Sequence, residues 1–152
     1  MNGRILLAVG TIIAGVAVGS GALGAHWFEG QAKRLYDDES VRERRMHNWE
    51  TASQYQMYHG LALLAVGLAA LYAPSRRWGI AAWLFVLGVL LFSGSLYAVA
   101  LSGTTNLRDV PLGGVMIVAT PIGGLCYLGG WLMMLAAIAG VARERPGKGS
   151  AP

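Results

Sequence analysis

The chain has 152 residues, of which 55% are apolar and only 13% are charged, and its formal net charge is +4. Soluble domains carry about 25% charged residues, so this composition excludes an ordinary soluble domain. The single cysteine excludes an intrachain disulfide framework. The basic residues flank apolar segments and do not form an aromatic-interleaved patch, which argues against nucleic-acid binding and for contact with lipid headgroups.

Four apolar segments are long enough to cross a bilayer core of about 30 Å, which takes about 20 helical residues. They are residues 5–28, 52–73, 78–101 and a fourth segment within 115–142. Because lipid offers no partner for free backbone N–H and C=O groups, each segment should be helical. The sequence therefore predicts an all-α, integral membrane four-helix bundle. It forms a single four-span domain over residues 1–142, followed by a short, basic, disordered tail at 143–152.

The first segment begins after Arg4, and the string at residues 22–25 resembles the cleavage region of a signal peptide. Its apolar run exceeds the usual 7–15 residues of a signal peptide, which favours a retained helix. Small residues at Gly15 and Gly19, and at Ala17, Gly21 and Ala25, have the spacing of a close helix-packing face.

Charge is concentrated between the first two spans, where residues 29–50 hold five basic and six acidic side chains. Mixed signs with few glycines are typical of a helix with exposed charge. Asp38, Ser40 or both are suited to cap a helix that starts near Val41 and continues into the second span. We therefore expect a charged, partly helical loop between the first and second helices.

The fourth span has a start signal in Thr120 and Pro121, followed by Gly123 and Gly124. A threonine N-cap before a proline at the first helical position suits a helix start. Residues 112–119 would then lie at the interface or form a re-entrant piece, whereas the alternative is one longer helix kinked at Pro121. We favour the capped start. Its free N–H groups could hold an anion or lipid phosphate, although a plain turn is the simpler interpretation.

Polar side chains enter the apolar spans at a few positions. Ser53, Gln56 and His59 follow one another around one helix in steps of about 60°. Polar groups inside a membrane are costly unless they are paired, so we treat the polar side chains of the spans as a candidate intramembrane patch. With His26, expected at a depth similar to that of His59, the patch comprises His26, Ser53, Gln56, His59, Ser93, Ser95 and Tyr97.

The patch has two interpretations. One is a hydrogen-bonded site or proton relay centred on His59; the other, which we favour, is that Gln56 and His59 bond neighbouring helices and fix their packing. No HExxH or CxxC motif is present, so we expect no metal and no cofactor. No Asp or Glu lies within a span to complete a catalytic triad, so we do not expect an enzyme.

Four strings along the chain carry a resemblance to a known family. They are GALGAH at 21–26, WETASQYQMYH at 49–59, LFSGSLY at 91–97, and TPIGGL at 120–125 with the Gly130-Trp131 pair. In this order they resemble the small membrane proteins of the domain-of-unknown-function family 423, which includes a mitochondrial transmembrane relative in animals. The resemblance covers about residues 5–140. It implies a four-span, mainly inner-membrane protein, and it implies no established activity, cofactor or catalytic residue.

The chain departs from the family pattern in two places. Its first loop is longer and more charged, and residues 107–118 look like an extension before the TPIGG turn. Either insertion could serve a partner specific to this protein.

Four spans place both termini on one side of a bacterial inner membrane. Lys and Arg are equally numerous on the two sides, six on each. The unopposed basic clusters at Arg76-Arg77 and in the C-terminal tail favour a cytoplasmic location for both termini.

Two functions are compatible with these features. The first is a structural or accessory membrane protein that packs with itself or with a larger membrane complex through glycine-rich faces. The alternative is a small transporter, proton pathway or lipid-binding protein that uses the polar patch around Gln56 and His59.

Overall fold

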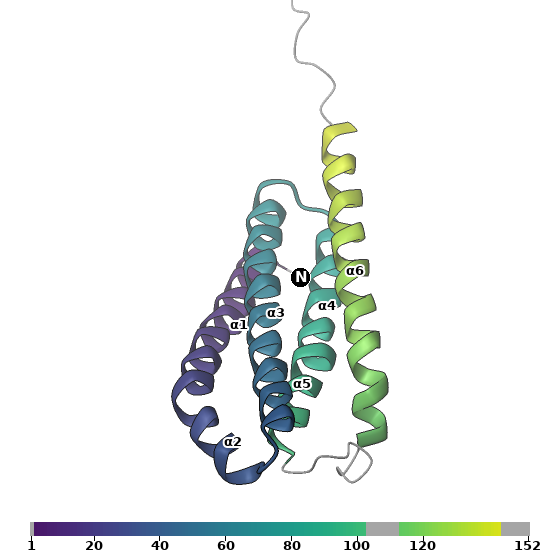
Figure 1. Cartoon of the computed structure of the whole chain (residues 1–152). Coiled ribbons are helices and arrows are strands. Elements are labelled where there is room, and N and C mark those ends of the chain that lie inside the picture. Colours follow the sequence, from purple (N-terminus) through teal and green to yellow (C-terminus); the bar gives the residue numbers. More distant parts are fainter. Residues whose placement is uncertain (1, 103–112, 144–152) are drawn as a thin grey trace, which may run out of the picture.

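The computed structural model describes residues 2–102 and 113–143, and all regular structure in these ranges is helical (Figure 1). Residues 107–112, half of the extension at 107–118, and residues 144–152 of the predicted tail at 143–152 lie outside the described residues. Arg143, the first residue of that tail, is the last residue of the final helix. The elements in chain order are α1 (Gly3–Leu23), the π-helical turn η1 (Gly24–Phe28), α2 (Glu29–Leu35), α3 (Glu39–Tyr72), α4 (Arg76–Gly88), the π-helical turn η2 (Val89–Ser93), α5 (Gly94–Leu101) and α6 (Gly113–Arg143).

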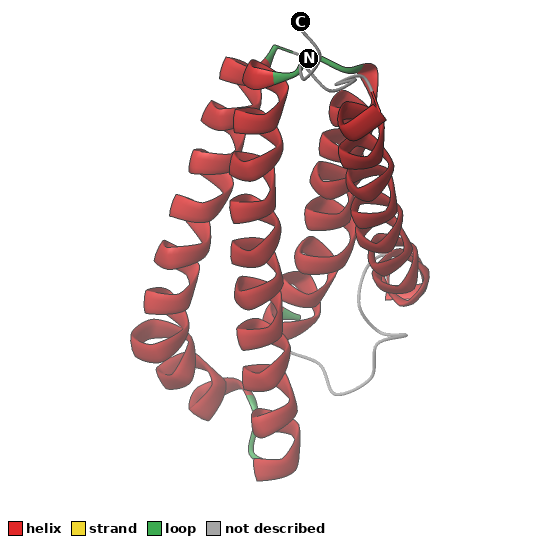
Figure 2. Cartoon of the chain, turned by 90° about the horizontal axis from the view of Figure 1, so that it is seen from above, coloured by secondary structure: helices red, strands yellow, loops and turns green. Residues whose placement is uncertain are grey.

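The two π-turns join their neighbouring helices without a break, so the elements form four long helical arms. Figures 1 and 2 show α1 beside α3, and α4–α5 beside α6, with α3 also packed against α5. The start of α1 and the end of α6 lie at the same end of the bundle. Gly3 packs against Leu71 there, and Gly140 packs against Arg77. The predicted all-α membrane bundle is confirmed.

Three helical stretches are long and apolar enough to cross a membrane: Gly3–Leu35, Arg76–Leu101 and Gly113–Val141. The remaining arm is α3, the second in chain order. It carries charged residues up to Glu50 and polar side chains as far as His59, and it is less apolar than the other three arms. It packs directly against α1 and α5. The multi-span bundle is therefore confirmed, whereas the four-span count and the side of the termini stay predictions.

Glycines bring α1 and α3 into backbone contact. A Cβ atom on Gly60 would lie 2.8 Å from the Ala14 backbone nitrogen, and one on Gly67 would lie 2.9 Å from the backbone nitrogen of Leu7. On α1 and η1 the small residues that face α3 recur every seven residues, at Gly3, Gly10, Ala17 and Gly24. A repeat of seven keeps one helix face turned to its partner.

The small-residue spacing noted in the sequence is not this face. Ala17 is buried, but Gly15, Gly19 and Gly21 have open space where a Cβ would be. The buried face of α1 instead consists of Gly3, Gly10 and Ala17 together with Leu6, which is fully buried.

The predicted start of the fourth span is wrong, because α6 runs through Pro121 from Gly113. The Thr120 hydroxyl donates to the Met116 carbonyl 3.0 Å away, one turn back in the same helix, and does not cap a helix start. Proline removes one helical hydrogen bond, which membrane helices tolerate. A re-entrant loop over residues 113–119 would leave many more backbone groups without a hydrogen bond, so the continuous helix is the more stable arrangement in lipid.

The predicted cap of the second long helix is confirmed. Asp38 accepts a hydrogen bond from the Ser40 backbone at 2.8 Å, and α3 begins at Glu39 and continues to Tyr72. The hydroxyl of Ser40 bonds the same carboxylate and holds the pKa of Asp38 below its usual value. The connection is more helical than expected, because α2 extends the first arm as far as Leu35.

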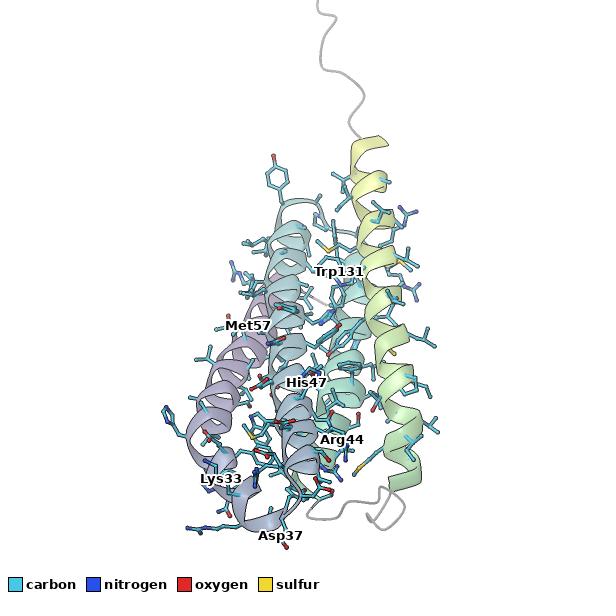
Figure 3. The ribbon with its side chains drawn as sticks, viewed as in Figure 1. Lys33, Asp37, Arg44, His47, Met57 and Trp131 are labelled. Carbon is cyan, nitrogen blue, oxygen red and sulfur yellow. The ribbon has the colours of Figure 1, made fainter. Side chains whose placement is uncertain are left out.

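Two side chains attach the charged end of the bundle to α5. Arg45 is 5% exposed, donates to the Val99 carbonyl at 2.6 Å and lies over the ring of Tyr36. The Tyr36 hydroxyl donates to the Ala100 carbonyl at 3.2 Å. A cation at the C-terminal end of a helix is favourable because that end carries partial negative charge. Figure 3 shows Lys33, Asp37 and Arg44 at this end, away from Trp131.

We expect Gly60→Ala to lower the free energy of unfolding by about 1–3 kcal/mol, because the added methyl group meets the backbone of Ala14. Gly21→Ala is the matched control, since its methyl group enters open space and alanine favours a helix by about 1 kcal/mol. Unfolding in mixed micelles by titration with a denaturing detergent measures both. Equal midpoints for the two variants would contradict the close α1–α3 contact.

Candidate intramembrane site

Gln56 links three helices. It lies on α3 and is 5% exposed. Its Nε2 donates to the Ile13 carbonyl of α1 at 3.0 Å, and its Oε1 accepts a hydrogen bond from the Tyr97 hydroxyl of α5 at 3.1 Å. Both ends of the amide are therefore used inside the bundle, where an unpaired amide would be costly.

His59 lies one turn further along α3 and is 4% exposed. The Trp131 indole N–H, on α6, donates to its Nε2 at 3.3 Å, so the proton of the neutral ring is on Nδ1. That nitrogen donates to the Tyr55 carbonyl at 2.8 Å. The imidazole thus holds one tautomer with both nitrogens engaged.

The ring of Tyr127 lies flat against His59, with centroids 3.5 Å apart and planes inclined by 6°. Its hydroxyl is 3.3 Å from the Ser93 hydroxyl, at the end of η2. Gly88 makes room for the ring, because a Cβ there would overlap it. This stack joins α3, α6 and the middle of the α4–α5 arm.

A second hydroxyl pair joins α5 to α6. Ser95 Oγ lies 2.6 Å from Thr120 Oγ1 and 2.9 Å from the Phe92 carbonyl. Thr120, predicted as a helix cap, therefore serves as a partner across the helix interface. Gly123 lets α6 approach the backbone of Phe92, and Gly124 lies beside the Phe92 ring.

Five of the seven predicted patch residues are brought into these contacts: Gln56, His59, Ser93, Ser95 and Tyr97. Ser53 is left out, since its hydroxyl bonds only the Glu50 carbonyl of its own helix at 2.9 Å. His26 is also left out, because it is exposed on η1, close to the level at which Gly24 contacts Trp49.

The expectation that His26 and His59 share a depth is wrong. Trp49 contacts Gly24 and so marks the level of η1, and His59 follows Trp49 by ten residues, which correspond to about 15 Å of helical rise. The first span was expected to end near residue 28. Instead α2 continues the first arm to Leu35, and the chain reverses direction only after that residue.

An open groove of about 610 Å³ adjoins this network, between α3 and α6. Aromatic rings make up most of it, and the α4–α5 arm contributes Phe92. Its lining residues are Tyr55, Tyr58, His59, Phe92, Pro121, Gly124, Leu125, Tyr127, Leu128 and Trp131.

Most aromatic residues of this site lie outside the patch predicted from the sequence. Tyr127 and Trp131 are four residues apart, as are Tyr55 and His59, which is the spacing of one helix face. That pattern is visible in the sequence, but which two faces meet is a tertiary fact.

The side chains of this site bind the helices together through hydrogen bonds and ring contacts. Among the described residues, no three His, Cys, Asp or Glu side chains lie close enough to hold a metal ion. No buried side-chain nitrogen or oxygen of the described ranges lacks a hydrogen-bond partner. The groove lining contains no carboxylate, ammonium or guanidinium group.

We expect the Gln56–Tyr97 hydrogen bond to contribute about 0.6 kcal/mol, the mean for such bonds between membrane helices, and less than about 1.7 kcal/mol. The double-mutant cycle of Gln56→Leu and Tyr97→Phe measures it through the free energy of unfolding in micelles. A coupling energy indistinguishable from zero would mean that the two groups do not bond in the membrane.

Comparison with known proteins gives the family. Residues 20–124 match the family described as "Protein of unknown function (DUF423)". A UPF0382 membrane protein of Staphylococcus haemolyticus is 38% identical over 87% of this chain and 93% of its own length. The UPF0382 membrane protein YwdK of Bacillus subtilis is 32% identical over 88% of this chain and 95% of its own length.

No solved structure matches the chain. The relatives are bacterial and are named membrane proteins, which agrees with the apolar helices. The predicted multi-pass bacterial membrane location is therefore confirmed, and the chain belongs to the DUF423 family of membrane proteins.

Proposed function

We propose that this protein is a non-enzymatic accessory protein that packs in the membrane against a second transmembrane segment, from its own copy or from a larger complex. The observation that carries the proposal is the uncovered face of α1. Its inner face contacts α3 through closely packed glycines, whereas Gly15 and Gly19 have open space beyond them.

The uncovered face is a continuous strip of small residues. Ala8, Gly15, Gly19 and Ala22 are all exposed and lie within about 60° of one another around the helix. Transmembrane helices associate mainly by close packing, and small residues allow their backbones to approach. Within the chain, this packing is already used between α1 and α3, so the same chemistry is available on the opposite side.

The charged end of the bundle supports the proposal with a contact surface outside the bilayer. Lys33 and Glu29 form an exposed ion pair at 2.8 Å, and Arg34 and Arg44 are exposed nearby. Arg45 and Tyr36 hold this end rigidly to α5, so its charges keep a defined arrangement.

We expect Gly15→Leu with Gly19→Leu to abolish the oligomer, or the co-purifying partner, that wild-type protein retains in mild detergent. The two leucines fill the strip that a partner backbone would approach, and the Cβ atom of neither meets an atom of the described chain. Affinity purification from native membranes, followed by mass spectrometry and size-exclusion chromatography, measures this. Gly21→Leu, also in open space, is the control.

Monomers alone, without a partner in several mild detergents, would contradict the accessory role. Equal retention of the partner by the double variant and by wild type would show that the partner does not bind the Gly15–Gly19 strip of α1.

The second candidate is a transporter or proton pathway through the polar site. It is favoured by the convergence of Gln56, His59 and Tyr97 within the bundle. It is the weaker proposal, since both nitrogens of His59 already have partners. His59→Ala and Gln56→Ala should abolish flux in reconstituted vesicles if it holds, and wild-type behaviour of both variants excludes it.

A further inference from the structure

We propose that the groove between α3 and α6 binds one acyl chain of a phospholipid, with the Tyr55 and Tyr58 hydroxyls donating to its ester oxygens. This site is on the side of α3 away from α1, so the proposal is independent of the accessory role.

The size of the groove matches one lipid chain. Its volume of about 610 Å³ lies within the range of about 300–1,000 Å³ of ligand sites. From Pro121 to Trp131 it follows α6 for ten residues, about 15 Å, which is half of a bilayer core of about 30 Å and hence one leaflet. A helix about 10 Å wide over the same length needs about 1,200 Å³, twice the volume present.

Two tyrosine hydroxyls in the groove have no partner in the described part of the chain. Tyr55 is 39% exposed and Tyr58 is 56% exposed, and neither hydroxyl forms a hydrogen bond with a described residue. The hydroxyls of Tyr97 and Tyr127, by contrast, are both bonded within the bundle. An unpaired hydroxyl beside the apolar walls of the groove is costly, so an occupant that accepts two hydrogen bonds is favoured.

The depth of these hydroxyls points to ester oxygens. Tyr55 follows Glu50, the last charged residue of α3, by five residues, or about 8 Å of helical rise. Side chains on a helix lean toward its N-terminus, so both tyrosines lean toward the Glu50 end, where the headgroups begin. Ester oxygens of a phospholipid lie at that boundary while its acyl chains run inward.

The chemistry of the lining agrees with a neutral chain and a headgroup outside. The rings of Tyr55 and Phe92 lie 4.8 Å apart, and Leu125 and Leu128 complete an apolar surface. The lining offers no carboxylate or ammonium group to a phosphate. The acyl chain would thus contact the aromatic rings, and only its ester end would meet polar donors.

Native mass spectrometry of the full-length chain, purified in mild detergent and titrated with phosphatidylglycerol, tests the site. We expect one lipid to be retained per chain. Tyr55→Phe with Tyr58→Phe should weaken the binding about five- to tenfold, since two hydrogen bonds are lost and the rings remain. Gly124→Phe should abolish binding by filling the groove, and Gly21→Phe, which enters open space, should bind as wild type.

Wild-type affinity in the tyrosine double variant overturns the hydrogen-bond assignment, and this variant keeps the fold because only hydroxyls change. Equal lipid retention by Gly124→Phe and Gly21→Phe, both checked by circular dichroism, overturns the groove as the site. Retention of an isoprenoid quinone in place of phosphatidylglycerol, or of a second chain that covers the groove, also overturns the proposal.

Discussion

The backbone contact between α1 and α3 positions the rest of the molecule. Gly10, Gly60 and Gly67 allow the two helices to approach until backbone atoms touch. Only at that distance does the Gln56 amide reach the Ile13 carbonyl. Since α3 then presents its other faces to α5 and α6, the same contact places His59 opposite Trp131 and Tyr127. In lipid such packing replaces the hydrophobic effect as the force between helices.

Polar side chains give the bundle its register. Hydrogen bonds from α3 to three other arms each require one rotation and one depth, and aromatic stacking of His59 on Tyr127 requires another. Each bond adds little stability, but together they exclude helix rotations that leave a polar group in hydrocarbon. The helix α3 is the least apolar of the long helices because it carries charged residues up to Glu50 in addition to Gln56 and His59 of this network.

Two of the surfaces that this packing leaves uncovered bear on function. One is the small-residue face of α1, and the other is the aromatic groove between α3 and α6. Their chemistries differ: the first has no functional groups and suits another helix, whereas the second carries free phenol hydroxyls and suits a lipid. A membrane accessory protein that holds a lipid beside its protein partner would use both surfaces.

The all-α class, the apolar spans and the Asp38 cap follow from the sequence, because hydropathy and local capping act within a few residues of one segment. Most of the polar patch was also predictable, since Gln56, His59, Ser93, Ser95 and Tyr97 stand out in apolar surroundings. The continuous course of α6 through Pro121 was not, because a cap signal in water competes with backbone pairing demanded by lipid.

The tertiary structure alone decided which faces meet. Many glycines have similar spacing, and only the docked helices separate the contact face at Gly10 from the open face at Gly15. The roles of Tyr127 and Trp131, and the separation of His26 from His59, likewise depend on the relative depth of different arms. That depth is set by packing between residues far apart in the chain, which no local pattern encodes.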